Sequence, residues 1–447
     1  MLYDKSVSRI CENGKVISMK GIVYPRIAET LFAQLLGTVN TLMLTGYSEN
    51  AVSAVGVVGT VINFILILST LVSSGMRIIM SVSIGEKNTE RENQSKGTGI
   101  CLGFLYGIFM AILASSFSSS IVRVMNLSGE IGNMAKGYLS IRVWGTPFYA
   151  VNICLNQILI CKGLAKGVLF SGIVSNILNV ILGYIVLYSG LPLPVDGVNG
   201  LALGAVISQI GALLTSYYVC RKNSCIEGSH LSVNLAKDIF RIGVPGTMNS
   251  TAYNIAQIIS ASFIASLGSI SINTKAYVSS LVVYTYLISL SIGQANGVLI
   301  GIYRGRGDFD SIKKLHRQNI ILCLLCNTCV SLLIFIFRKP LISLFTHNLE
   351  ILKMAGIILL IDIFVEIPRS FNHTFETSIL ANGDTKATFW ISLTACWGFS
   401  VLFAYVLGIK LKLGLYGIWI AFVMEEGFKS LCYAIRWKGE KWKHTRI

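Results

Sequence analysis

Long apolar runs follow one another along almost the whole chain, and a short polar or charged connection separates each run from the next. Each run is long enough to cross about 30 Å of hydrocarbon as an α-helix, whereas barrel strands would be shorter and would alternate strictly. The pattern therefore predicts twelve membrane-spanning helices. Their expected bounds are 22–45, 51–83, 98–122, 138–160, 168–189, 198–220, 243–267, 274–302, 318–337, 352–381, 388–409 and 414–435.

The prolines and glycines that border these runs recur once along the chain, with an offset of about 220 residues. Pro25 and Pro245 each open an apolar run, and Gly163 and Gly383 each follow one. Each copy contains six predicted helices, an even number, so both copies have the same orientation across the membrane. The sequence therefore predicts an all-α membrane protein whose twelve transmembrane helices form two six-helix lobes related by a parallel repeat.

This repeat sets the expected domain boundaries. The expected parts are a cytoplasmic N-terminus (1–20), an N-lobe (21–220), a cytoplasmic linker (221–241), a C-lobe (242–436) and a cytoplasmic tail (437–447). Transporters that are built from such repeats bind their substrate near the middle of the membrane, between the halves.

The composition fits a membrane protein, because 53% of the 447 residues are hydrophobic and 13% are charged, against about 25% charged in soluble domains. The formal net charge of +16 does not indicate a nucleic-acid partner, since Lys and Arg gather in the connections. The side that holds both termini carries 24 of them, and the opposite side carries 7. The positive-inside rule then predicts a multi-pass protein of the plasma membrane with both termini in the cytoplasm.

The eleven cysteines lie mostly inside predicted helices and show no paired spacing on an outer connection, so a disulfide framework is not expected. Cys323, Cys326 and Cys329 form a C-x-x-C-x-x-C series, which we interpret as small packing residues on an apolar helix. No histidine cluster with zinc spacing accompanies them. We therefore expect no metal site and no cofactor.

One predicted helix, 352–381, concentrates ionisable residues on one face. Asp362, Glu366, Arg369, His373 and Glu376 follow at i, i+4, i+7, i+11 and i+14. At about 100° per residue they occupy a wedge roughly 80° wide. Lipid could not solvate such a stripe, so it should face protein or a water-filled cavity.

The functional interpretation of this stripe is a site for the coupling ion or the substrate. Glu366 is the first candidate, since it lies one turn from both Asp362 and Arg369, and Asp362 is the second. The alternative is a structural salt-bridge network, because Arg369 could neutralise one acid permanently. Glu376 lies nearer the expected cytoplasmic end, where an interfacial position would also explain it.

Other polar positions are secondary candidates. Asn249, Tyr253 and Gln257 form a polar face on the seventh predicted helix, which could line a cavity or join helices. Glu29 on the first predicted helix is an intramembrane acid one turn beyond Arg26, and local pairing is the alternative there.

Three further charges, Lys275, Glu425 and Glu426, are expected near helix ends. Snorkelling to the interface would explain them.

Several short motifs follow one another in a fixed order. They are Pro25 with Gln34 and Val39-Asn-Thr41, Tyr138-Leu-Ser-Ile-Arg142 with Gly145-Thr-Pro147, Asn176-Ile-Leu-Asn179, Gly243-Val-Pro245, Gly383-Asp-Thr385, and Gly417-Ile-Trp419 with Arg436-Trp437. Together they resemble the MATE (multidrug and toxic compound extrusion) family over nearly the whole chain. The resemblance implies twelve helices in two six-helix lobes, and export of amphipathic cationic compounds in exchange for Na⁺ or H⁺.

The chain departs from the family pattern in three places. Asn40 stands where many members carry an Asp, Gly183 stands where an Asp often follows the Asn179 position, and Tyr253 stands where some members carry a Glu. The carboxylate cation site of the family's N-lobe therefore cannot be carried over. Asn40 and Asn179 could still offer neutral oxygens to Na⁺, but an amide cannot accept a coupling proton.

The sequence thus favours a secondary antiporter rather than an enzyme. It would export organic cations or amphipathic drugs in exchange for H⁺ or Na⁺ by rocking of two lobes, and it would work as a monomer in the lipid bilayer. The alternative is a flippase for a lipid-linked precursor, for which Arg77, Arg142, Lys275 and Arg369 could form a cationic cavity. A remote alternative is a membrane-embedded transferase, but no acidic pair or His-plus-acid set stands at an interfacial connection to perform that chemistry.

Overall fold

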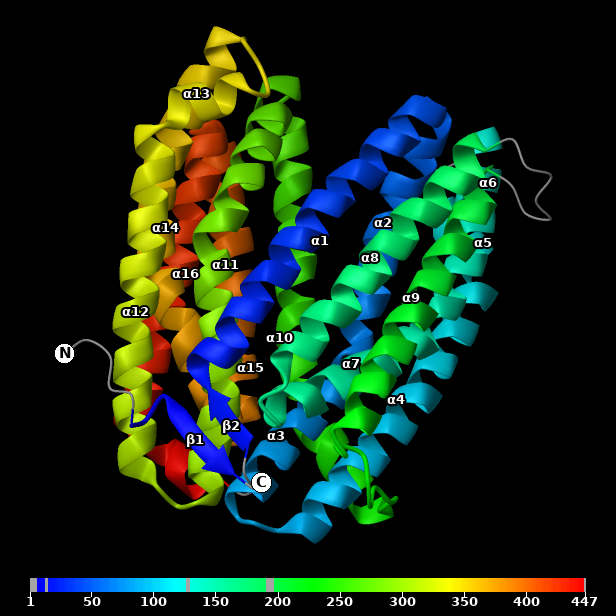
Figure 1. The fold of residues 1–447 in the computed structure, drawn as a ribbon. Helices are drawn as coiled ribbons and strands as arrows, with labels where there is room; N and C mark the ends of the chain where they lie inside the picture. Colours follow the sequence, from blue (N-terminus) through cyan, green and yellow to red (C-terminus); the bar gives the residue numbers. More distant parts are fainter. Residues whose placement is uncertain (1–5, 13–14, 126–128, 190–196, 446–447) are drawn as a thin grey trace. The chain divides into compact units, whose positions relative to one another are not determined.

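The computed structural model describes residues 6–12, 15–125, 129–189 and 197–445, and long helices make up most of this part of the chain (Figure 1). The first half contains α1 (Met19–Tyr47), α2 (Glu49–Ser69) with α3 (Leu71–Gly85), α4 (Thr89–Ser116) with α5 (Ser118–Val124), α6 (Gly129–Arg142) with α7 (Thr146–Cys161), α8 (Ala165–Tyr188) and α9 (Gly197–Lys222). A two-stranded sheet of β1 (Arg9–Glu12) and β2 (Lys15–Ser18) precedes them.

The second half repeats this plan. It contains α10 (Val233–Ser266), α11 (Ser269–Gly305), α12 (Phe309–Ile336) with α13 (Arg338–Ser343), α14 (Leu349–Ala381), α15 (Thr385–Thr394) with the π-helical segments Ala395–Val401 and Ala404–Lys410, and α16 (Gly414–Lys438). Every predicted span therefore coincides with a helix or with consecutive helical segments, and the all-α prediction is confirmed.

Within the described residues, eight of these twelve helical rods are both long enough and apolar enough to cross a membrane by themselves. The four others are the α6–α7 rod, α10, α14 and α16. The last three carry polar or ionisable side chains in their middle turns, which lowers their hydropathy. Packing against other helices must therefore shield their polar side chains from lipid.

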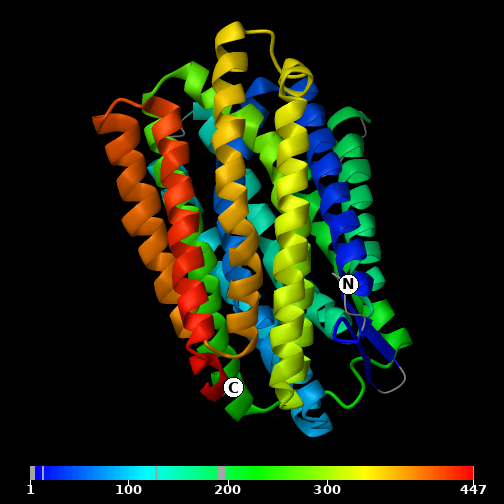
Figure 2. The same cartoon turned by 90° about the vertical axis from the view of Figure 1, so that its left-hand side faces the viewer.

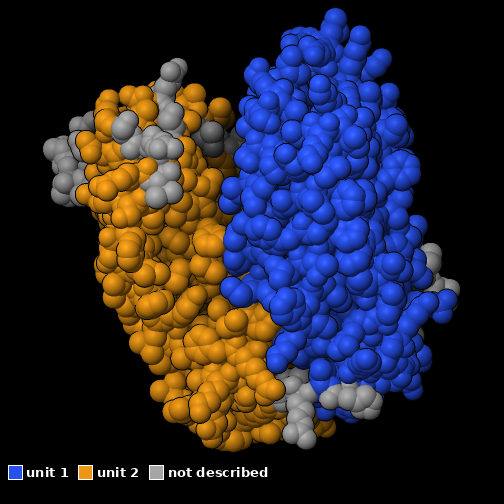
Figure 3. Space-filling view, turned by 180° about the vertical axis from the view of Figure 1, so that it is seen from behind, with its two compact units in different colours: residues 1–10, 248–447 blue, residues 11–247 orange. Residues whose placement is uncertain are grey.

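The chain divides into two compact units, which Figure 3 colours separately: unit 1 comprises residues 1–10 and 248–447, and unit 2 comprises residues 11–247. The boundary falls inside α10, whose first part belongs to unit 2 and whose second part belongs to unit 1.

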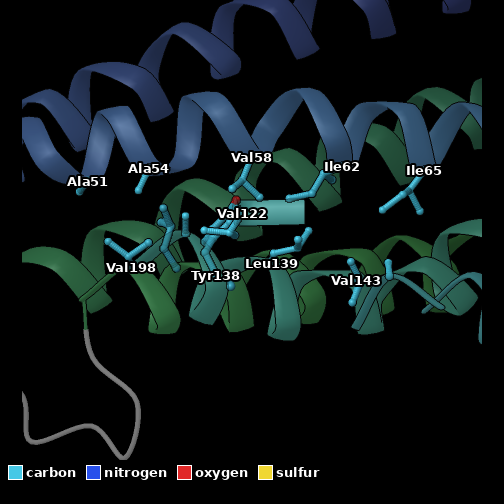
Figure 4. Close-up of a cluster of buried hydrophobic side chains, with 14 of the residues drawn as sticks. Ala51, Ala54, Val58, Ile62, Ile65, Val122, Tyr138, Leu139, Val143 and Val198 are labelled. Atoms are coloured by element: carbon cyan, nitrogen blue, oxygen red, sulfur yellow. The ribbon is translucent and has the colours of Figure 1, made fainter. Parts of the chain in front are cut away.

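Unit 2 has its main hydrophobic core where α2 packs against α6. Ala54, Val58 and Ile62 recur every four residues on α2, so their side chains share one face. That face points toward Tyr138 and Leu139 of α6 (Figure 4). The burial of these apolar side chains fixes the rotation of α2.

Two glycines allow α3 and the first part of α10 to pack in direct backbone contact. A Cβ on Gly75 would lie 2.2 Å from the carbonyl oxygen of Ile239, and a Cβ on Gly243 would lie 2.2 Å from that of Leu71. The contact is reciprocal, so each helix presents its glycine to the other helix's backbone. Small residues at helix contacts are the usual device for close approach in membranes.

In unit 1, α14 lies between α12 and α16 (Figure 2) and also packs against α11. Its half toward Leu349 is held by an apolar core that includes Ile358 and Leu359 of α14, Val278 of α11, and Ile418 and Phe422 of α16. Because three helices surround it, α14 can hold ionisable side chains away from lipid.

The tail after α16 packs back onto unit 1. Residues Lys441–His444 form a short 3₁₀ turn in which the side chain of Trp442 is fully buried and stacks on Trp437, with ring centroids 4.4 Å apart. Arg304, at the end of α11, donates to the carbonyl oxygens of Lys443 (2.7 Å) and Thr445 (2.9 Å). The tail is thus joined to α11 by charge-assisted hydrogen bonds.

Candidate functional site

A cavity of about 350 Å³ lies inside unit 1, among α10, α11, α14 and α16. Its ionisable lining residues, tyrosines apart, are Arg369, His373, Glu376, Glu426 and Lys429. The first three belong to the predicted stripe on α14, while Asp362 and Glu366 do not line the cavity. The stripe therefore faces protein and a cavity, as its composition requires.

Arg369 is the centre of the charge arrangement. It forms an ion pair with Glu366, one turn earlier on α14, and its Nε donates to Glu426 of α16 at 3.2 Å. Its guanidinium also lies over the ring of Tyr286 of α11, 5.4 Å from the centroid. Two carboxylates thus share one cation, and these contacts connect α14 to α16.

Glu366 is completely buried and receives a second hydrogen bond, from Nδ2 of Asn327 on α12 at 3.0 Å. Asp362 is 3% exposed and accepts from Nε1 of Trp419 on α16 at 3.1 Å. Both acids are therefore satisfied by protein groups on neighbouring helices. This is the arrangement that the structural alternative describes.

Glu376 has a different environment. It lines the cavity and accepts a hydrogen bond from Nδ2 of Asn249 on α10. Among the described residues, no Lys, Arg or His lies within 4.0 Å of its carboxylate. Glu376 is therefore the carboxylate of the stripe that faces the cavity without a cationic partner in contact.

The charges of α16 lie inside the protein and not near a helix end. Glu425 and Glu426 are 2% and 6% exposed, and Lys429 is 8% exposed. The expectation that Glu425 and Glu426 snorkel is therefore wrong, because α16 runs from Gly414 to Lys438 and places them in its middle. Lys429 forms an ion pair with Glu425, one turn away, and lies over the ring of Tyr253 at 5.2 Å.

The cluster has more negative than positive groups. Five carboxylates belong to it, and two side-chain cations, Arg369 and Lys429, oppose them. The carboxylates are Asp362, Glu366, Glu376, Glu425 and Glu426. Burying uncompensated charge is costly in a medium of low dielectric constant. The site therefore favours additional positive charge, either as a cation or as bound protons.

A buried row of polar contacts joins α14 to α12 on the side that carries Glu366. The hydroxyl of Thr374 donates to Sγ of Cys323 at 3.5 Å, and the hydroxyl of Ser378 lies 2.8 Å from Nδ1 of His316. Together with the Asn327–Glu366 bond, these contacts hold α14 to α12, while ion pairs hold it to α16. The rotation of the stripe is thus fixed from both sides.

The secondary candidates divide between the units. In unit 1, Asn249 and Tyr253 line the cavity, whereas Gln257, one turn further along α10, does not. The sequence reasoning missed Gln294 and Asn372, which also line the cavity. As single uncharged residues on long helices, they gave no signal that separated them from ordinary packing residues.

In unit 2, the two amides that were considered as neutral ligands for Na⁺ lie together. Nδ2 of Asn40 on α1 donates to Oδ1 of Asn179 on α8 at 2.7 Å. Glu29 forms an ion pair with Arg26 at 2.6 Å, which is the local pairing considered from the sequence. Among the described residues, no group of three or more His, Cys, Asp or Glu side chains is placed to hold a metal ion.

Comparison with known proteins identifies the family. The model of the family MatE matches residues 25–185 and residues 245–406. The chain belongs to the MATE family. The two matches begin 220 residues apart, which is the offset of the repeat seen in the sequence. The family fold has twelve helices in two lobes, and its members are transporters rather than enzymes, so these predictions are confirmed.

Similar proteins cover almost the whole chain. The uncharacterized transporter YisQ of Bacillus subtilis (strain 168) is 29% identical over 436 residues, which are 96% of this chain and 95% of that protein. The probable multidrug resistance protein NorM of Thermotoga maritima is 23% identical over 442 residues, which are 95% and 93% of the two chains. A solved structure, described as the outward-facing conformation of a multidrug resistance MATE family transporter, has a TM-score of 0.85 at 20% identity and covers 95% of this chain and 96% of its own.

Proposed function

We propose that this MATE-family chain is a secondary antiporter that exports organic cations or amphipathic drugs in exchange for H⁺ or Na⁺, by rocking of its two lobes. The observation that carries the proposal is the cavity of unit 1, whose surrounding cluster has five carboxylates and two side-chain cations. A relative that is named as a probable multidrug resistance protein supports the substrate class.

The cavity offers two kinds of contact to an organic cation. Its negative excess favours positive charge, and Tyr253 and Tyr286 line it with aromatic rings. Aromatic faces attract cations electrostatically and also bury apolar surface. A substrate that is both positively charged and partly apolar would use both.

Glu376 is the carboxylate that we assign to coupling. Glu366 and Asp362 accept hydrogen bonds from Asn327 and Trp419 and lie outside the cavity lining, whereas Glu376 faces the cavity with no cation of the described residues in contact. A coupling ion or proton on Glu376 and a cationic substrate beside it would compete for the same negative charge. Such competition is the thermodynamic requirement for exchange.

The test is transport in proteoliposomes, with a fluorescent cationic dye and an imposed H⁺ or Na⁺ gradient. Glu376→Gln should reduce gradient-driven dye transport at least about tenfold, because it removes the titratable charge but keeps the hydrogen-bonding shape. Glu350→Gln is the matched control, since Glu350 lies in the first turn of the same helix and is exposed. Wild-type transport by Glu376→Gln would refute the assignment.

The two remaining stripe acids are tested in the same assay. Asp362→Asn and Glu366→Gln should leave coupling to the gradient in place, even where the amount of folded protein falls. If either variant folds normally and abolishes coupling while Glu376→Gln does not, the coupling site lies on the α12 side of α14, as the sequence analysis first suggested.

The flippase alternative would need a cationic cavity. Arg369 contributes little to one, because Glu366 and Glu426 both pair with it. Arg142 supports the alternative in unit 2, since its Nη1 is buried without a hydrogen-bond partner among the described residues. Transport that requires a lipid-linked precursor and no ion gradient would favour the flippase over the antiporter.

A further inference from the structure

Unit 2 contains a second cavity, of about 610 Å³, between the beginnings of α1 and α8. These helices lie side by side and run in the same direction, since a Cβ on Gly163 would meet the carbonyl oxygen of Val16, while a Cβ on Gly172 would meet Glu29. The cavity therefore opens at the end where both helices start. This site shares no residue with the cavity of unit 1.

The lining of this groove separates into two kinds of surface. Lys20 and Lys166 supply the charged groups, and both residues are exposed. The other surface is largely apolar or aromatic and includes Tyr24, which is 64% exposed, and Phe170, which is 54% exposed. No Asp or Glu belongs to the lining among the described residues. The groove thus combines two ammonium groups with an apolar floor.

Pro25 adds a backbone acceptor to the groove. Proline has no N–H, so it cannot bond to the carbonyl of Gly21, four residues earlier on α1. Both residues line the cavity, and Gly21 has no side chain to cover that carbonyl. A ligand hydroxyl or ammonium group could use it.

We propose that this groove binds one anionic glycerophospholipid of the membrane leaflet at the end where α1 and α8 begin. The phosphate would lie between Lys20 and Lys166, and an acyl chain would lie along Tyr24, Phe170 and Ile173. Basic pockets between helices on the cytoplasmic side are suited to such headgroups, and the positive-inside rule predicts that this end is cytoplasmic. A soluble acidic peptide fits less well, because it would leave the exposed aromatic side chains uncovered.

The experiment is native mass spectrometry of the full chain in detergent, titrated with phosphatidylglycerol and, separately, with phosphatidylcholine. The wild type should retain phosphatidylglycerol preferentially. Each of Lys20→Ala and Lys166→Ala should weaken this binding about fivefold, and the double variant about 25-fold. Lys20→Arg/Lys166→Arg should retain it, since both charges remain.

The matched control is Lys222→Ala/Lys237→Ala. These two exposed lysines belong to the same unit, at the end of α9 and near the start of α10, so the variant removes the same charge away from the groove. The proposal predicts unchanged phosphatidylglycerol binding. An equal loss in this control would show a nonspecific charge effect and would overturn the proposal.

A second variant tests the contribution of the groove's shape while the two lysine charges remain. Ala28→Trp places a large ring in the cavity and keeps both lysines. It should abolish the preference for phosphatidylglycerol. If Ala28→Trp and the double lysine variant both bind phosphatidylglycerol like the wild type, or if inorganic phosphate displaces the lipid completely, the groove is not a phospholipid site.

Discussion

Arg369 on α14 and Glu426 on α16 form a buried ion pair at 3.2 Å, 57 residues apart in the sequence, while the same guanidinium pairs with Glu366 on its own helix. The pair connects two helices that are too polar to pass as membrane spans by composition. Arg369 therefore contributes both to the stability of unit 1 and to the shape of its cavity.

The first prediction concerns this arginine. Arg369→Leu leaves Glu366 and Glu426 buried without their cation, which should cost about 3–5 kcal/mol of unfolding free energy. Thermal unfolding in detergent measures the effect. Arg338→Leu is the control, because Arg338 donates to a carbonyl at 2.9 Å and lies over the ring of Phe335, with no carboxylate in contact among the described residues. Equal losses in the two variants would contradict the central role of Arg369.

The second prediction concerns the glycine contact in unit 2. Gly75→Ala and Gly243→Ala each place a Cβ 2.2 Å from a carbonyl oxygen of the other helix, so α3 and α10 must move apart. Both variants should unfold at lower temperature than the wild type. Gly246→Ala on the same α10 meets no atom within 4 Å and should be neutral or slightly stabilising. A wild-type melting temperature for Gly75→Ala would show that the helices tolerate separation.

The third prediction concerns the tail. Arg304→Ala removes hydrogen bonds to the carbonyls of Lys443 and Thr445, so the tail should detach more often and trypsin should cut after Lys441 faster. Arg306→Ala is the control, since Arg306 is exposed and lies two residues away. The helices of unit 1 should remain protected in both variants. Unchanged cleavage would mean that the stacking of Trp442 on Trp437 is sufficient to hold the tail.

The fourth prediction concerns pH. The carbonyl of Gly228 and the carboxylate of Glu90 raise the pKa of His230, whose Nε2 lies 2.7 Å from Oε1 of Glu90. This contact should be complete below the ordinary pKa of histidine and should be lost as pH rises through the raised value. Hydrogen exchange of residues 226–232, corrected for intrinsic rates, should therefore increase over that range. Glu90→Gln should remove the pH dependence, and a pH profile that persists in this variant would assign it to another group.

The apolar runs placed all twelve helices, although only eight of them are long and apolar enough to cross a membrane by themselves among the described residues. The rule that a span is apolar indicated α14 as special, since its stripe violates it. The same rule applies to α16, where Glu425, Glu426 and Lys429 are also buried in the middle of the helix. Their importance was missed because Glu425 and Glu426 were expected near a helix end, where charged side chains can reach the interface.

The rest of the site depends on contacts that no local pattern contains. Asn249 approaches Glu376 from 127 positions away, and Asn327 approaches Glu366 from 39. Packing decides which face of α10 or α12 contacts α14. The sequence therefore indicated a polar face on a helix but not the helix that this face contacts. The π-helical segments between Ala395 and Lys410 rotate the residues that follow them, and hydrophobic periodicity does not reveal such a change.

The polar composition of α14 also has a consequence for biosynthesis. Arg369 can pair with Glu366 as soon as α14 is made, but Glu426 belongs to α16, which is made later. Until α16 arrives, the insertion machinery or neighbouring helices must shelter α14 from lipid. A chain that stops before α16 would lack Glu426, and Arg369 would keep Glu366 as its one ion-pair partner among the described residues.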